Sequence, residues 1–137
     1  MATSLISQIE ASFLTQIVAG TTLEGALAGT QQAVGLYPWA FVGIAGGPVT
    51  YLGNSQMDVE YTVTVLVESR DCEITRYAIE ELLGLFTAWN GSNAMYNLGV
   101  FWINPTASEI PTPINPPAND SVFGTVTYTM KVRYSYA

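Results

Sequence analysis

The chain has 137 residues, a formal net charge of −7, 49% hydrophobic residues and only 11% charged residues, which fits one domain spanning residues 1–137. It contains four cations and no histidine, so we expect neither nucleic-acid binding by a basic surface nor catalysis or metal binding through histidine; we predict no enzyme, no cofactor and no metal. No apolar run is long enough to cross a membrane, and the beginning of the sequence lacks the pattern of a signal peptide.

Residues 3–18 are predicted to form an amphipathic helix that ends at Gly20. Apolar side chains recur at spacings of three and four and form one stripe along it: Leu5, Ile6, Ile9, Phe13, Ile17 and Val18. The next residues, 21–36, fit either a short helix or a loop, because Gly25 and Gly29 each weaken a helix by about 1 kcal/mol relative to alanine.

Residues 39–44 are predicted to form a strand that ends in a glycine-rich turn. The turn contains Gly46, Gly47 and Pro48. These glycines do not match a phosphate-binding loop, because neither a lysine nor a helix follows them. We therefore interpret the segment as a flexible hairpin arm.

Residues 57–69 give the clearest strand pattern of the sequence, because apolar and polar side chains alternate. One face is predicted to join the core: Val59, Tyr61, Val63, Val65 and Val67. The other face carries Glu60, Thr62, Thr64, Leu66 and Glu68. This second face is polar enough for water and flat enough for a partner.

Residues 73–89 are predicted to form a second amphipathic helix. Its buried stripe is expected to contain Ile74, Ala78, Leu82, Leu85, Phe86 and Trp89, which share one face at helical spacing. Arg76 and Glu80 are four residues apart and are expected to form an ion pair. Cys72, the single cysteine, is interpreted as a structural residue.

The last part of the sequence predicts two strands joined by a proline-rich loop. Residues 98–103 form a nearly continuous apolar run, which is typical of a strand covered on both faces. Residues 122–136 alternate over roughly 50 Å, at about 3.3 Å per residue, so part of this strand projects, bends or pairs with another chain. Between them, residues 104–121 have no helix or strand pattern and hold five of the seven prolines. Prolines favour an extended, semi-rigid chain, so we expect this loop to contact an adjacent subunit or the next ring of an assembly.

Together these elements predict an α+β fold. It consists of a mostly antiparallel sheet of about four strands, two helices packed on one face, and long projecting hairpin and loop arms. The opposite face of the sheet would show Thr62, Thr64, Leu66, Thr125, Thr127 and Thr129. A flat threonine-rich face and long strand ends are hazards for a monomer, but they suit strands whose edges close on neighbouring subunits in a ring.

The order of the elements resembles a known family. The stretches that carry the resemblance are SLISQIEASFLTQIV, YPWAFVGIAGG, VEYTVTVLVES running into EITRYAIEELLGLFTAW, and GTVTYTMKVRYSY. In these the chain resembles the tail terminator (tail completion) proteins of long-tailed bacteriophages, and the small neck proteins that join phage heads to tails. The resemblance covers nearly the whole chain and implies a subunit of a six-fold homo-oligomeric ring, without catalytic residues. Such a ring, assembled in the host cytoplasm, caps the tail tube at the head–tail junction or tail end of the virion. It stops polymerisation of the tail tube protein and joins the tail to the head connector.

Subunit or partner contacts are expected in three places. The first is the threonine-rich face named above, and the second is the turn formed by Gly46, Gly47 and Pro48. The third is the proline loop, with Ile110, Pro111, Pro113, Ile114, Pro116 and Pro117. Two alternatives stay open: another tail or neck subunit, such as a tail tube or head-closure protein, and a small module that binds a ligand or peptide.

Overall fold

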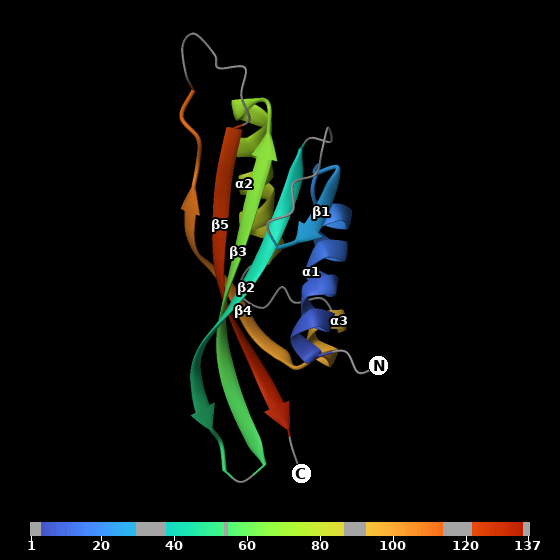
Figure 1. Cartoon of the computed structure of the whole chain (residues 1–137), viewed down its shortest axis with the longest axis vertical. Helices are drawn as coiled ribbons and strands as arrows, with labels where there is room; N and C mark the ends of the chain where they lie inside the picture. The colour runs from blue at the N-terminus through green and yellow to red at the C-terminus, as the bar shows by residue number, and fades with distance from the viewer. Residues whose placement is uncertain (1–3, 30–37, 54, 87–92, 114–121, 136–137) are drawn as a thin grey trace.

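The computed structural model describes residues 4–29, 38–53, 55–86, 93–113 and 122–135. In chain order, its elements are α1 (Leu5–Gly20), β1 (Gly25–Ala28), β2 (Trp39–Tyr51), β3 (Gln56–Ser69), α2 (Cys72–Leu85), α3 (Asn93–Asn97), β4 (Val100–Glu109) and β5 (Val122–Ser135). The strands form one sheet in the order β1-β2-β3-β5-β4. Pairing is antiparallel throughout, except that β1 runs parallel to β2. The predicted α+β class with a mostly antiparallel sheet is confirmed, and β1 and α3 are additions to it (Figure 1).

Both long helices begin at residues that cap them well. The side chain of Ser4 accepts a hydrogen bond from the amide of Ser7 at 3.1 Å. Asp71 accepts from the amides of Glu73 and Ile74 at 2.8 and 3.2 Å. These bonds satisfy amide groups that have no partner within the first turn of a helix.

The core lies between the two helices and one face of the sheet. Phe13 from α1, Phe86 from the end of α2 and Tyr128 from β5 form an aromatic cluster, with ring centroids 4.7 Å apart for Phe13–Phe86 and 5.4 Å for Phe86–Tyr128. All three side chains are fully buried. The hydroxyl of Tyr128 donates a hydrogen bond to the carbonyl oxygen of Leu82. This bond ties β5 to α2 and satisfies the one polar group that Tyr128 brings into the core.

The buried side of α2 differs from the predicted stripe. Side chains that are fully buried along α2 and at its end are Thr75, Ala78, Ile79, Leu82 and Phe86. Ile74, which was predicted to be buried, is 44% exposed. Thr75 turns inward instead, because its hydroxyl lies 2.6 Å from that of Ser69 at the end of β3, which fixes the rotation of the first turn. Trp89 lies outside the described residues.

Arg76 does not pair with Glu80 as predicted. Its Nε donates a hydrogen bond to the carbonyl oxygen of Pro111 at 2.8 Å, and Nη1 lies 3.6 Å from Glu73. The thiol of Cys72 also contacts the carbonyl oxygen of Pro111, at 3.5 Å. The first turn of α2 therefore holds the chain that follows β4, and this contact between distant segments takes priority over a local pair.

A short helix or a loop was predicted for residues 21–36. Residues 25–28 form the short strand β1 instead. Gly25 pairs with Trp39 in the parallel ladder, and a Cβ at Gly25 would lie 2.7 Å from two carbon atoms of the Trp39 ring. The amide of Gly29 continues the contact by donating to the carbonyl oxygen of Val42 at 2.8 Å. Gly25 is thus required by the close approach of an aromatic ring.

The glycine-rich turn predicted after residue 44 is a bulge within a longer strand. β2 continues to Tyr51, and its register with β3 shifts between Gly46 and Val49. A Cβ at Gly47 would lie 2.6 Å from the carbonyl oxygen of Glu60, so the bulge needs a glycine there. The reversal of the chain comes later, where the amide of Leu52 donates to the carbonyl oxygen of Gln56 at 2.9 Å.

The predicted strand 98–103 begins at Val100 and runs on to Glu109. It takes in the start of the segment that was predicted to lack structure. Pro105 is accommodated because β4 is at the edge of the sheet, where a missing N–H is tolerated. Val100 and Ile103 are buried but Phe101 and Trp102 are only half-buried, so β4 is not the doubly covered strand that its apolar run indicated.

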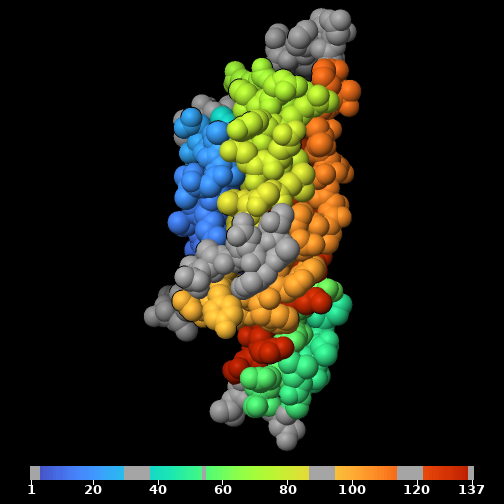
Figure 2. All heavy atoms as spheres, turned by 180° about the vertical axis from the view of Figure 1, so that it is seen from behind, coloured from blue at the N-terminus to red at the C-terminus, as the bar shows by residue number. Residues whose placement is uncertain are grey.

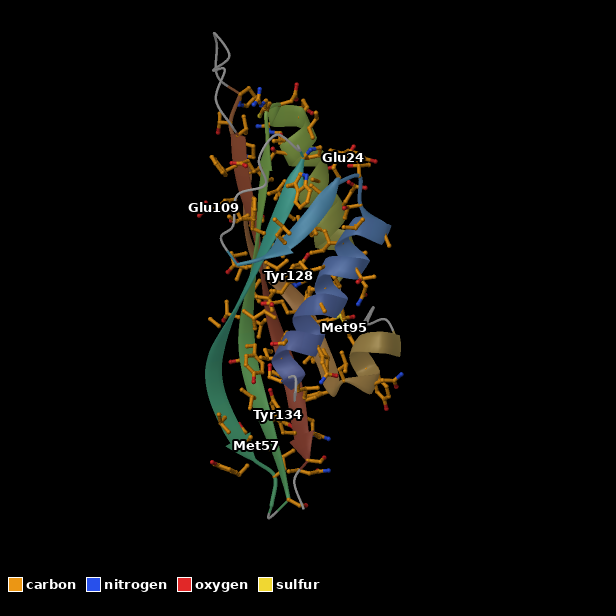
Figure 3. All side chains as sticks on the ribbon, turned by 45° about the vertical axis from the view of Figure 1, so that its right-hand side comes forward. Glu24, Met57, Met95, Glu109, Tyr128 and Tyr134 are labelled. Carbon is orange, nitrogen blue, oxygen red and sulfur yellow. The ribbon has the colours of Figure 1, made fainter. Side chains whose placement is uncertain are left out.

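Beyond the helices the sheet continues as a projection (Figure 1). The end of β2 and the start of β3 extend past the ends of α1 and α3, and we call residues 46–53 and 55–60 the hairpin arm. Figure 2 shows from behind that α1 and α2 lie side by side, with the arm beyond them. Met57 and Tyr134 are in this projecting part, whereas Tyr128 is at the level of the helices (Figure 3). The predicted projecting hairpin is therefore present, although its glycines are in a strand.

Candidate functional site

The face of the sheet opposite α1 and α2, which we call the open face, brings together the predicted threonine-rich residues. Cross-strand pairing aligns Thr62 with Thr129, Thr64 with Thr127, and Leu66 with Thr125. The valines between the β3 residues are fully buried on the helix side, as the alternation of a strand requires. Thr62 and Thr64 are exposed, whereas Leu66 and the three threonines of β5 are half-buried.

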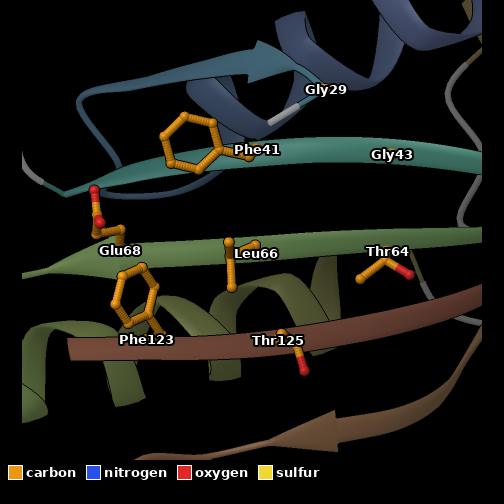
Figure 4. Close-up of a pocket in the computed structure, with 8 residues that line it drawn as sticks. All are labelled: Gly29, Phe41, Gly43, Thr64, Leu66, Glu68, Phe123 and Thr125. Atoms are coloured by element: carbon orange, nitrogen blue, oxygen red, sulfur yellow. The ribbon is translucent and has the colours of Figure 1, made fainter. Parts of the chain in front are cut away.

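At one end, the open face deepens into a pocket of about 390 Å³. Its walls come from β2, β3 and β5 and from the residue after β1: Gly29, Phe41, Gly43, Thr64, Leu66, Glu68, Phe123 and Thr125. Figure 4 shows these side chains in front of the strands, with the helices behind. Two aromatic rings, Phe41 and Phe123, flank Glu68. The pocket therefore combines mostly apolar walls with one carboxylate.

Glu68 is the unusual residue of this pocket. It is only 4% exposed and is the only charged residue that is buried in the part of the chain that the structure describes. Its carboxylate makes no hydrogen bond or ion pair with the described residues. Trp39 is its partner in the β2–β3 ladder, and the indole Nε1 is buried, also without a hydrogen-bond partner.

Sequence reasoning missed the pocket. It placed Glu68 on the polar face of its strand, and it did not connect Phe41 or Phe123 with that residue. The alternation of residues 57–69 gives the face correctly. What it lacks is the pairing of β3 with both β2 and β5, which sets Glu68 opposite Trp39 on one side and Phe123 on the other.

The hairpin arm carries the second group of predicted contact residues. Gly46, Gly47 and Pro48 are all exposed. Past the bulge, the arm exposes three apolar side chains: Val49 (47%), Tyr51 (70%) and Leu52 (43%). From residue 43 onward, β2 pairs only with β3 among the described residues, because β1 reaches no further than Val42. The arm therefore presents an unpaired strand edge together with apolar side chains.

The third predicted group, in the proline loop, is only partly described. Ile110 is 49% exposed, Pro111 is half-buried and Pro113 is exposed. The carbonyl of Pro111 is held by α2, so the start of the loop binds its own subunit. Ile114, Pro116 and Pro117 lie outside the described residues. Contact of the loop with an adjacent subunit stays a prediction.

Basic side chains are spread over the structure and engaged locally. Arg133 forms two hydrogen bonds with the carboxylate of Asp58, at 2.8 and 3.1 Å. These bonds hold the pKa of Asp58 below its usual value. Lys131 lies over the ring of Trp102, with its Nζ 5.1 Å from the ring centroid. Each of these contacts links β5 to a neighbouring strand, and none of them brings several cations together into a patch.

No group of metal-ligating side chains is present among the described residues. Within the same part of the chain, no helix has the length and apolar character needed to cross a membrane. Comparison of the sequence with protein-family models and with curated proteins finds no match. The open face, the pocket and the edges of the sheet are therefore the candidate contact sites of the described residues.

Proposed function

We propose that this protein is a ring-forming structural subunit of the tail terminator type, which caps a phage tail tube, stops its growth and joins it to the head connector. One observation carries the proposal. The outer edge of β2 is unpaired along the hairpin arm among the described residues, and apolar side chains are exposed beside it. An unpaired, uncharged strand edge is a template for pairing with another chain.

The two edges of the sheet are suited to each other. β3 is antiparallel to β2, β5 is antiparallel to β3, and β4 is antiparallel to β5, so β4 runs opposite to β2. A second copy whose β4 approaches the free edge of β2 would therefore extend the sheet by an antiparallel pair. Contacts of this head-to-tail kind, repeated around an axis, close into a ring.

Composition agrees with a surface that is covered in the assembly. Only 11% of the residues are charged, compared with about 25% in an average domain. The middle of the open face, between Glu60 and Glu68, presents rows of threonine rather than charges. A neutral face of this kind can lie against a neighbouring subunit or the tail tube protein without charge desolvation.

The purified protein should form closed rings, visible by negative-stain electron microscopy, with a single oligomer in native mass spectrometry. A tail tube protein, which is the main alternative, would grow into long tubes under the same conditions. A monomer that neither assembles at high concentration nor binds tail tubes would contradict the proposal.

A further inference from the structure

We propose that the pocket on the open face binds an ammonium or guanidinium group carried on an apolar stem, with Glu68 as its counter-ion. The proposal concerns a ligand of the individual subunit and does not depend on ring formation. It rests on the burial of Glu68, the lack of a compensating group within the chain, and the shape and chemistry of the walls.

The carboxylate of Glu68 belongs to a residue with little exposure and has no partner among the described residues. A buried charge is ordinarily paired or hydrogen-bonded, because removal from water without a partner is strongly unfavourable. Glu68 is only 4% exposed as a residue. Its carboxylate oxygens are not among the fully buried atoms without a partner, so they keep some contact with solvent, but they form neither kind of contact with the described residues. Asp58, in contrast, is held by Arg133 on the neighbouring strand. A positive group entering the pocket would remove this unfavourable term.

No cation of the chain itself supplies the missing charge. Arg133 is bound to Asp58, Lys131 lies over Trp102, and Arg76 is bound to the carbonyl of Pro111. Arg70, the fourth cation, is exposed and has a contact of its own, and no ion pair between it and Glu68 is present.

Polar neighbours of Glu68 do not compensate its charge either. Trp39, directly opposite in the ladder, has a hydrogen-bond donor in Nε1, yet this atom is buried without an acceptor. Glu68 and Trp39 therefore lie on adjacent strands, and neither the carboxylate nor the indole N–H forms a hydrogen bond with the described residues.

The walls select for a cation with an apolar stem. Phe41 and Phe123 flank the carboxylate, and Leu66 lies between them (Figure 4). Aromatic faces attract cations, and apolar walls favour the methylene or aromatic part of the same ligand. A volume of about 390 Å³ falls within the range of small-ligand sites, roughly 300–1,000 Å³.

The same chemistry is offered by a free amine and by a lysine or arginine side chain of another protein. Both sources can be tested by isothermal titration calorimetry at pH 7. The probes are phenethylammonium, its neutral counterpart 2-phenylethanol, and N-acetyl-arginine amide. We expect the wild-type protein to bind at least one of the cationic probes at least tenfold more tightly than the alcohol. Preference for phenethylammonium would indicate a free amine, and preference for the arginine derivative would indicate a protein side chain.

Two variants isolate the carboxylate. Glu68→Gln keeps the size of the side chain and removes its charge, so we expect the tenfold preference for the cation to disappear. Its melting temperature should stay close to that of the wild type, because no described residue forms a hydrogen bond or ion pair with the carboxylate, and this shows that the variant folds. Glu60→Gln, on the same face of β3 and half-exposed, is the matched control and should keep the preference. Equal binding of cation and alcohol by the wild type, no binding of any probe at millimolar concentration, or an unchanged preference in Glu68→Gln would overturn the proposal.

Discussion

A single hydroxyl in the core joins the sheet to the second helix. Tyr128 is fully buried, and its hydroxyl donates to the carbonyl oxygen of Leu82. Burial raises the pKa of Tyr128 above its ordinary value of 10.0, because the interior disfavours the phenolate. The neutral form is therefore part of what makes the fold stable.

Tyr128→Phe should lower the free energy of unfolding by about 1 kcal/mol at pH 8, since Leu82 loses its hydrogen-bond donor while the ring remains. This contribution is fully present below pH 10, where the unfolded tyrosine is neutral too, and it declines as the pH rises above 10. Urea denaturation of both proteins at pH 8 and pH 11 measures it. The wild type should lose more stability than the variant over this interval; Tyr134, whose pKa is also raised, leaves some loss in both. An equal loss would contradict the assignment.

Among the elements, the short strand β1 depends most on one small residue. Gly25→Ala would place a methyl group 2.7 Å from the Trp39 ring, and Trp39 is the direct partner of Gly25 in the β1–β2 ladder. We expect a loss of about 1–3 kcal/mol, as for overpacking in a core. Gly43→Ala is the matched control in β2, because nothing lies within 4 Å of a Cβ there. Thermal denaturation compares the two; similar melting temperatures would show that β1 is not packed as described.

Elements with a strong period could be predicted from the sequence, whereas those set by tertiary contacts could not. The spacing of Ile9, Phe13 and Ile17 and the alternation of residues 57–69 reflect burial directly, so α1 and β3 were predicted to within a few residues. β1 was missed because a glycine such as Gly25 occurs both in loops and where an aromatic ring such as Trp39 approaches the backbone closely, and the local sequence does not distinguish the two. The bulge at Gly47 was interpreted as a turn for the same reason.

The candidate site shows the same division. The threonine rows of the open face follow from alternation within β3 and β5, and the sequence predicted them. The pocket does not, because Phe41, Glu68 and Phe123 come from three strands and meet only through the register of both ladders. A single glutamate on a polar strand face carries no local sign that it will be buried.

For the whole molecule, the extent to which the helices cover the sheet decides which parts of the sheet can contact a partner. The helices cover one face of the sheet and stop before the hairpin arm (Figure 1). The arm therefore extends without support on the helix side, where Val49 and Tyr51 are exposed. An isolated two-stranded hairpin is marginally stable in water, and here β5 gives a third strand but no covering layer. A neighbouring subunit would supply that layer.

Tyr51→Glu tests whether the arm is the assembly surface. Tyr51 is 70% exposed, so the substitution should leave the fold and its melting temperature nearly unchanged. A carboxylate buried in a subunit contact would be unpaired and costly, and we expect the oligomer to dissociate to monomers. Tyr77→Glu on α2 is the matched control, because Tyr77 is also exposed, at 57%, and the substitution adds the same charge away from both sheet edges. Size-exclusion chromatography with light scattering should show monomers for Tyr51→Glu and the wild-type oligomer for Tyr77→Glu. If both variants assemble like the wild type, the arm does not carry the contact, and the proposed ring loses the observation that supports it.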